Sequence, residues 1–371
     1  MLRHLVVVAL WALAVPAQGS AGVAGHVYLT TNEATGNRVV AFERLADGSL
    51  RPAGEVETGG LGTGSGLGNQ GALALSRDGH WLAAVNAGSD SVSLLEATAG
   101  GLVLRDLAAS GGRLPVSVAI QGRRLYLLNA GGSAGGEDGV TGFSIEPSGR
   151  LAPIPGGQAP LSASATGPAQ VGFAAAGRVL VVTEKATDRI DTYVVRDDGS
   201  LDGPFPHPSA GSTPFGFAVS RDRLIVSEAA GGRPLASSAS SYEVGDDGSL
   251  EPVTPVAFTR QTAACWAAAT PDGRFAYVAN AGSASVTGYS VDPDGALSLL
   301  QADGLSGSTG AGTSPVDLAS SRDGRFLYVL ARLPAPGAAA VAGFAVGSDG
   351  SLAPLGATAG LPRTATGMAV R

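Results

Sequence analysis

The stretch Asp198-Gly199-Ser200-Leu201 returns in seven versions along the chain. Asp-Gly between two apolar runs is a strong signal for a tight hairpin turn, because such turns need backbone φ angles above zero. The glycines of the seven versions stand at positions 48, 101, 149, 199, 248, 295 and 350, so the repeat is close to 50 residues long. The other versions are Asp47–Leu50, Gly100–Leu102, Ser148–Leu151, Asp247–Leu250, Asp294–Leu297 and Asp349–Leu352.

Each repeat carries short apolar segments on both sides of such turns. In the second repeat we expect strands over 71–75, 81–85 and 92–95, with a fourth strand after Gly100-Gly101. Four short strands within about 50 residues are typical of one propeller blade. Seven repeats therefore predict an all-β fold, a seven-bladed β-propeller of four-stranded blades.

The two ends of the repeat region complement each other. The first repeat begins at His26–Leu29 without the small-residue strand that opens the other repeats, and the chain finishes with an unpartnered Gly367–Val370. We predict that this C-terminal strand completes the first blade and closes the ring. Closure would leave no open sheet edge at the seam.

The composition agrees with a turn-rich globular protein. The 371 residues include 56 Gly and 22 Pro, which break helix interiors, and 44% of them are hydrophobic. The formal net charge is −7 and no long run of like charges occurs, so we expect no nucleic-acid partner. Cys265 is the single cysteine, and no internal disulfide can form. We expect a monomer.

The N-terminus has the pattern of a signal peptide. Arg3 precedes an apolar run from Leu5 to Val15, and small residues follow up to Ala21. The run is too short for a bilayer span, which needs about 20 residues. We predict a signal peptide over 1–21, a single propeller domain over 22–371, and an exported mature protein of charge 23 − 31 = −8, periplasmic or secreted.

The loops of a blade divide between the two faces of the ring. In a four-stranded meander both hairpin turns lie on one face, which we call the hairpin face. The loop after the second strand and the connection to the next blade lie on the other, which we call the loop face. Loops of the second kind are long and irregular here, as in Gly59–Gly71 and Glu228–Ser238. Because sites concentrate in loops on a rigid scaffold, we predict the functional site on the loop face.

Several segments resemble the Tyr-Val-x-Asn repeats of seven-bladed propeller proteins. Tyr277–Val286, Ala84–Val92 and Tyr126–Ala130 carry the pattern. Together with the Asp-Gly-Ser-Leu turns and Pro271–Tyr277, they look most like the lactonase family, the group of 6-phosphogluconolactonase and carboxymuconate-lactonising enzymes. The resemblance covers essentially the whole chain after the signal peptide. It implies a hydrolase of a sugar-type or carboxylated lactone, and hence a small lactone or a carbohydrate as the ligand.

The resemblance also indicates catalytic residues. Family members usually carry Pro-Arg-His at the start of an inner strand and a Glu at the end of the next strand, facing the channel mouth. Glu228 matches that carboxylate, and Glu184 matches an acidic position before Thr-Asp-Arg; Pro214-Phe215-Gly216 stands where Pro-Arg-His is expected. Two carboxylates sharing a partly desolvated pocket would raise one pKa toward that of a general base. The structural alternative is that each carboxylate accepts loop hydrogen bonds or pairs with a cation.

Other polar or aromatic side chains are predicted at the same face. Arg260 and Arg233 could hold a substrate carboxylate or phosphate, or form surface ion pairs, and Gln261 follows Arg260 toward an inner strand. Trp266 on an inner strand could stack on a ligand or pack in the core. His207, which we place in a connecting loop, is the one imidazole suited to act as a base, the alternative being a solvated histidine.

The remaining motifs indicate structure. Asn86, Asn129 and Asn280 recur at one repeat position, which favours hydrogen bonds to the backbone within each blade. No histidines have metal-ligand spacing, so we predict no metal site and no cofactor. Two functions stay open: a lactonase-like enzyme, or a non-catalytic exported propeller that binds a protein or glycan through its loop face. The missing histidine favours the second.

Overall fold

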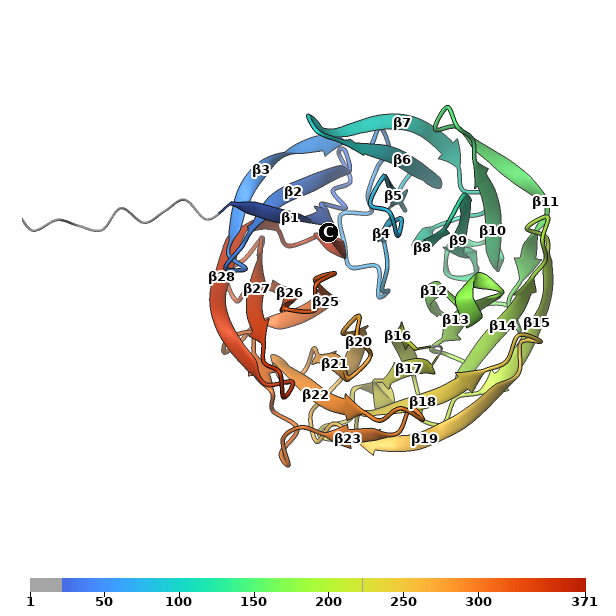
Figure 1. The fold of residues 1–371 in the computed structure, drawn as a ribbon. Coiled ribbons are helices and arrows are strands. Elements are labelled where there is room, and N and C mark those ends of the chain that lie inside the picture. The colour runs from blue at the N-terminus through green and yellow to red at the C-terminus, as the bar shows by residue number, and fades with distance from the viewer. Residues whose placement is uncertain (1–21, 222) are drawn as a thin grey trace, which may run out of the picture.

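Seven antiparallel sheets surround a central axis in the computed structural model, which describes residues 22–221 and 223–371 (Figure 1). From the axis outward, blade 1 consists of β29 (Thr366–Val370), β1 (Val23–Thr30), β2 (Arg38–Leu45) and β3 (Leu50–Glu57). Blade 2 consists of β4 (Leu73–Leu75), β5 (Trp81–Asn86), β6 (Ser91–Thr98) and β7 (Gly101–Ala109). Blade 3 consists of β8 (Pro115–Gln121), β9 (Arg124–Ala130), β10 (Asp138–Ile145) and β11 (Leu151–Pro160).

The other four blades repeat this order. Blade 4 consists of β12 (Pro168–Ala174), β13 (Val179–Glu184), β14 (Arg189–Val195) and β15 (Leu201–Pro208). Blade 5 consists of β16 (Pro214–Ser220), β17 (Arg223–Glu228), β18 (Ser238–Val244) and β19 (Leu250–Phe258). Blade 6 consists of β20 (Ala264–Ala269), β21 (Phe275–Asn280), β22 (Ser285–Val291) and β23 (Leu297–Leu299), with β24 (Gly307–Ser308) also paired to β22. Blade 7 consists of β25 (Ser314–Ser320), β26 (Phe326–Arg332), β27 (Ala338–Val346) and β28 (Leu352–Pro362).

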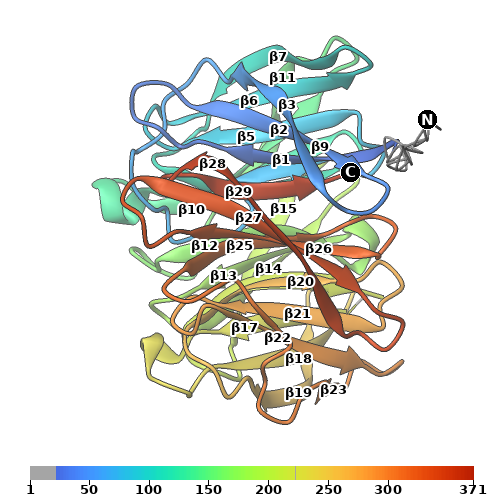
Figure 2. The same cartoon turned by 90° about the vertical axis from the view of Figure 1, so that its left-hand side faces the viewer.

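The C-terminal strand closes the ring as predicted. β29 pairs antiparallel with β1, with Val370 opposite Val27 and Met368 opposite Leu29. In Figures 1 and 2 the C-terminus accordingly lies beside β1. Blade 1 is thus built from both ends of the described chain, and the prediction of seven four-stranded blades is confirmed.

The Asp-Gly-Ser turns explain why the hairpin face is uniform. Gly48 adopts φ +86°, and Asp47 Oδ1 accepts hydrogen bonds from the backbone N–H of Ser49 at 2.9 Å and from its hydroxyl at 2.7 Å. These bonds lower the pKa of Asp47. The same bond from the serine N–H to the aspartate recurs at Asp198, Asp247 and Asp349.

A recurring bond joins neighbouring blades. The hydroxyl of a tyrosine on the second strand donates to the carbonyl of the turn glycine in the next blade, and we call this contact a tyrosine lock. Tyr328 donates to Gly48 at 2.8 Å and Tyr277 to Gly350 at 2.9 Å. Tyr126 donates to Gly199 in the same way. Because each lock satisfies a buried phenol, it favours one fixed angle between two blades.

Helical structure plays a small part. Three short 3-10 segments, Gly131–Ala134, Ala175–Gly177 and Ala230–Gly232, occur among the described residues. Within this part of the chain no helix is long and apolar enough to cross a membrane. The predicted signal peptide over 1–21 lies outside the described residues.

Candidate functional site

The connection from blade 1 to blade 2 crosses the channel mouth on the loop face. Figure 1 shows it reaching the centre of the ring between β3 and β4. The Gln70 carboxamide accepts a hydrogen bond from the Ala267 N–H at 3.0 Å and donates one to the Ala267 carbonyl at 2.8 Å. Trp266 Nε1 donates to the Asn69 carbonyl at 2.8 Å. Asn69 and Gln70, which we call the plug, therefore tie this connection to the inner strand of blade 6.

Gly216 makes room for the plug. A Cβ atom at Gly216 would stand 1.9 Å from Gln70 Oε1 and 2.7 Å from the Cys265 carbonyl oxygen. Gly216 is also the residue that replaces the histidine of the Pro-Arg-His motif. The Gln70 side chain thus occupies space that a histidine at position 216 would need.

A cavity of about 360 Å³ remains in the channel on the hairpin side of the plug. It is lined by Gln70, Gly71 and the parts of the inner strands that run toward the hairpin turns. Most of the lining is aliphatic, from residues including Leu75, Ile120, Ala268, Leu318 and Met368. Asp317 also lines it but is only 2% exposed, and burial raises its pKa to about 8. The prediction placed the site on the loop face, whereas this channel cavity lies toward the other face.

Glu228 ends β17 and is fully buried rather than open to the channel mouth. Its carboxylate accepts hydrogen bonds from the hydroxyls of Ser238, at 2.7 Å, and Ser240. Burial raises its pKa to about 7. Glu228 pairs with Ser238 as Asn280 pairs with Ser285 in the next blade, so it occupies the repeat position of the structural asparagines.

Glu184 holds the same repeat position in blade 4 and is also fully buried. It accepts hydrogen bonds from the Ser162 N–H at 3.0 Å and the Ser162 hydroxyl at 2.6 Å. Its carboxyl partner is Asp191, which accepts from the same N–H at 2.9 Å. Burial, then the hydrogen bond and charge of Glu184, raise the pKa of Asp191 to about 8.

The expectation that Glu184 and Glu228 share one pocket is therefore wrong. Glu184 contacts the connection that enters blade 4, and Glu228 contacts hydroxyls within blade 5. Aligning the repeats would have revealed this, because both glutamates stand where other blades carry Asn. Those asparagines bond mainly to hydroxyls rather than to the predicted backbone groups: Asn86 to Ser93 at 2.8 Å and Asn280 to Thr287 at 3.0 Å. Asn86 also accepts a bond from the Thr58 hydroxyl of the first repeat at 2.7 Å.

The predicted loop histidine lies in a strand. His207 belongs to β15, the outer strand of blade 4, because the strand continues to Pro208. Its Nε2 lies 3.0 Å from the Thr192 hydroxyl and 3.0 Å from the Gly248 carbonyl. Its strand and its two hydrogen-bond partners place His207 on the outer side of the blade, away from the inner strands.

Of the other predicted residues, Trp266 is buried in the core, whereas Arg260 and Arg233 are exposed. Trp266 is 6% exposed and packs edge-on against Phe215, with ring centroids 5.3 Å apart. Gln261 donates to the Asp303 carbonyl at 3.1 Å. Arg260 and Arg233 are exposed and form no ion pair with Asp or Glu in the part of the chain that the structure describes. Only these arginines remain available to an anion among the predicted binding residues.

Two further cations gather at the plug. Lys185, the single lysine of the chain, is half-buried; its ammonium donates to the carbonyls of Gly68 and, at 3.2 Å, Pro168. Burial lowers its pKa to about 8. Arg332 approaches the same loop, because a Cβ at Gly66 would stand 2.4 Å from its Nη2. Neither cation pairs with Asp or Glu among the described residues. No role was predicted for Lys185 from the sequence. Its place directly after Glu184 was the available signal that it lies near the site.

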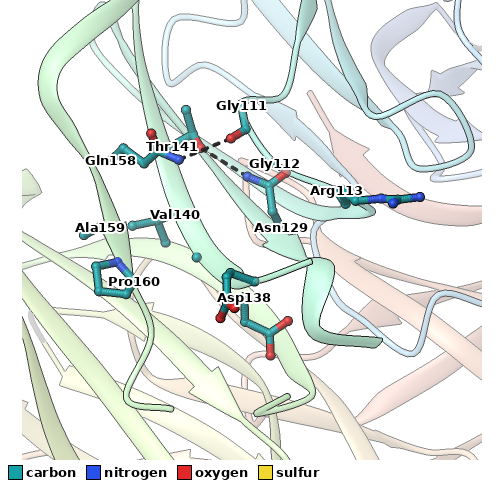
Figure 3. Close-up of a pocket in the computed structure, with 12 residues that line it drawn as sticks. Gly111, Gly112, Arg113, Asn129, Asp138, Val140, Thr141, Gln158, Ala159 and Pro160 are labelled. Atoms are coloured by element: carbon teal, nitrogen blue, oxygen red, sulfur yellow. Dashed lines mark hydrogen bonds between the residues drawn. The ribbon is translucent and has the colours of Figure 1, made fainter. Parts of the chain in front are cut away.

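A separate pocket of about 570 Å³ lies on the loop face of blade 3 (Figure 3). Gln158 donates to the Gly111 carbonyl at 3.2 Å, and Asn129 donates to the Thr141 hydroxyl at 3.1 Å. Asn129 Oδ1 is buried and has no partner among the described residues. None of the predicted site residues lines this pocket, so it stands apart from the channel mouth.

No cluster of three or more His, Cys, Asp or Glu suited to a metal occurs over 22–221 and 223–371.

Comparisons with known proteins agree with this architecture. A family profile described as "Lactonase, 7-bladed beta-propeller" matches residues 238–364, and no curated protein matches the chain. A periplasmic gluconolactonase of Pseudomonas aeruginosa is similar at 19% identity and TM-score 0.69, over 93% of this chain and 98% of its own. A Bacteroides fragilis protein provisionally named a 6-phosphogluconolactonase is similar at 19% identity and TM-score 0.69, over 96% and 99%. At such identities these structures show the fold. The comparisons and the closed ring of seven four-stranded blades thus show a seven-bladed β-propeller that is similar to the lactonase family over residues 238–364.

Proposed function

We propose that the protein hydrolyses a sugar-type or carboxylated lactone at the loop-face mouth of its channel, after export by the signal peptide. The observation that carries the proposal is Lys185, a half-buried amine at the plug whose pKa is lowered to about 8. The match of residues 238–364 to the lactonase profile and the lactonase names of similar structures support the reaction class.

The residues around the plug suit the steps of lactone hydrolysis. In its neutral form Lys185 can take a proton from the water that attacks the ring carbonyl, and the proton then passes to the ring oxygen as the C–O bond breaks. The backbone N–H groups of Gly66, Leu67 and Gly68 donate to no group in the described chain, so they are free to stabilise the oxyanion. Arg332 would hold a substrate carboxylate or phosphate.

The test is hydrolysis of δ-gluconolactone, its 6-phosphate and a muconolactone by purified mature protein, measured against the spontaneous rate. We expect the enzymatic rate to rise as the pH increases toward and through about 8, since deprotonation of Lys185 creates the base. Lys185→Met should lower kcat about 100-fold or more, the usual contribution of a general base. Arg332→Gln should raise KM for the anionic lactones and leave δ-gluconolactone nearly unaffected.

Glu228→Gln is the matched comparison, because Glu228 is fully buried. An activity lost in Glu228→Gln and retained in Lys185→Met would return the base role to the carboxylate predicted from the sequence. A folded protein that accelerates none of the three lactones would favour the alternative function, a propeller that binds a protein or glycan. The plug and Gly216 favour that alternative, since they occupy the expected position of the family histidine.

A further inference from the structure

Of the four tyrosines at the lock position in the described chain, Tyr28 makes no lock. Tyr28 in β1 holds the repeat position of Tyr126, Tyr277 and Tyr328, whose hydroxyls donate to a turn glycine of the next blade. The Tyr28 oxygen accepts a hydrogen bond from the Arg371 side chain, but no acceptor receives the hydroxyl proton among the described residues. The side chain is 4% exposed, so its phenol is held in place without the bond that its counterparts make.

The turn of blade 2 explains the missing lock. Blade 2 has Gly100-Gly101 where five other blades carry Asp-Gly, and Thr98 pairs directly with Gly101 in a tighter hairpin. No atom lies within 4 Å of a Cβ built on Gly101. A Cβ on Gly48, the equivalent glycine of blade 1, would stand 2.3 Å from Phe326. The turn of blade 1 fills the niche between blades 7 and 1. The turn of blade 2 leaves the corresponding niche between blades 1 and 2 open.

The result is a groove of about 640 Å³ between blades 1 and 2, within the usual size range of ligand sites. The His26 and Tyr28 rings stack in its wall, with centroids 5.7 Å apart and planes 7° apart. Arg371 also lines it, beside the Tyr28 hydroxyl, and forms no ion pair with Asp or Glu in residues 22–221 and 223–371. The groove thus combines a hydroxyl proton that has no acceptor with a guanidinium that has no carboxylate partner among the described residues.

We propose that this groove binds a turn-forming peptide segment of a partner protein, which presents a backbone carbonyl to Tyr28 and a carboxylate to Arg371. The occupied niches show what shape fits, since each receives a turn whose glycine carbonyl meets the tyrosine. In blade 1 that turn also carries a carboxylate, Asp47, one residue before the glycine. The site is independent of the proposed lactonase function, because the groove is lined by none of the residues of the channel mouth.

The probe is a fluorescent cyclic peptide with the sequence Ala-Asp-Gly-Ser-Leu of residues 46–50, titrated with mature protein and followed by anisotropy. We expect saturable binding that is about tenfold weaker in Tyr28→Phe, the effect of one lost hydrogen bond. Changing the peptide's Asp to Asn should weaken binding to the wild type but not to Arg371→Gln.

Tyr328→Phe is the matched control. Its hydroxyl already bonds Gly48, so this variant should lower Tm and leave peptide affinity unchanged. Tyr28→Phe should leave Tm unchanged and lower the peptide affinity. Ala53→Trp, at an exposed lining position, should obstruct the groove and abolish binding. The proposal is overturned by no saturable binding at about 1 mM peptide, or by equal affinities of the wild type, Tyr28→Phe and Ala53→Trp.

Discussion

The free energy of unfolding will be highest near about pH 5 and will fall by at least about 3 kcal/mol by about pH 8. Burial raises the pKa values of Asp317 to about 8 and of Glu228 to about 7. The pair of Asp191 with Glu184 behaves likewise, with the pKa of Asp191 raised to about 8. Most soluble proteins gain or keep stability over this range, so the direction is distinctive.

The sign follows from proton binding in the two states. In the unfolded chain these carboxyls lose their protons near about pH 4, whereas the folded state keeps them until the pH approaches 7 or 8. The folded state binds more protons between these limits, so stability decreases as the pH rises. Below about pH 4 the turn aspartates act in the opposite direction, since hydrogen bonds lower the pKa of Asp47 and Asp247.

Urea unfolding at pH values from about 4 to 9 tests this expectation. Asp317→Asn should flatten the decline, because a neutral amide replaces the carboxyl that must ionise while buried. Asp247→Asn, in an exposed turn, is the control and should leave the slope between about pH 5 and pH 8 unchanged. Stability that stays constant or rises over this interval would contradict the buried state of the three groups.

Gly216→Ala will destabilise the protein by about 2–3 kcal/mol, and Gln70→Ala will recover part of that loss. The added methyl group would overlap Gln70 Oε1 at 1.9 Å and approach the Cys265 carbonyl at 2.7 Å. Truncating Gln70 removes the first contact and leaves the second. Alone, Gln70→Ala should cost about 1–3 kcal/mol, since it leaves the N–H and C=O of Ala267 without their partner.

A double-mutant cycle in urea measures the coupling. Gly36→Ala is the matched control, because no atom lies within 4 Å of a Cβ at Gly36, and its cost should be small in both backgrounds. An equal cost of Gly216→Ala with and without Gln70 would show that the plug does not occupy the space beside Gly216. In Gln70→Ala, Gly216→His would then test whether the family histidine can be accommodated at its usual place.

Local patterns predicted the fold well because their causes are local. The Asp-Gly-Ser turns depend on a positive φ at glycine and on bonds between residues two apart, as at Asp47 and Ser49. The closing strand followed from counting strands in each repeat.

The candidate site was less predictable, because its contacts join distant parts of the chain. Gln70 meets Ala267 across 197 residues, so nothing near Gln70 in the sequence announces the plug. Glu184 was expected beside Glu228, yet it shares a backbone donor with Asp191, seven residues away. Resemblance to the family indicated which residue types to seek, but burial removed both glutamates from the channel mouth.

The repeat, the number of blades and the closure of the ring follow from the sequence, since strand alternation and turn chemistry act over a few residues. Tertiary packing fixes which side chains face the channel, which carboxyls lie together and which tyrosine makes no lock. These depend on how seven separately formed sheets pack against one another. A single shortened turn, at Gly100-Gly101, is enough to open a groove that the repeat pattern alone would fill.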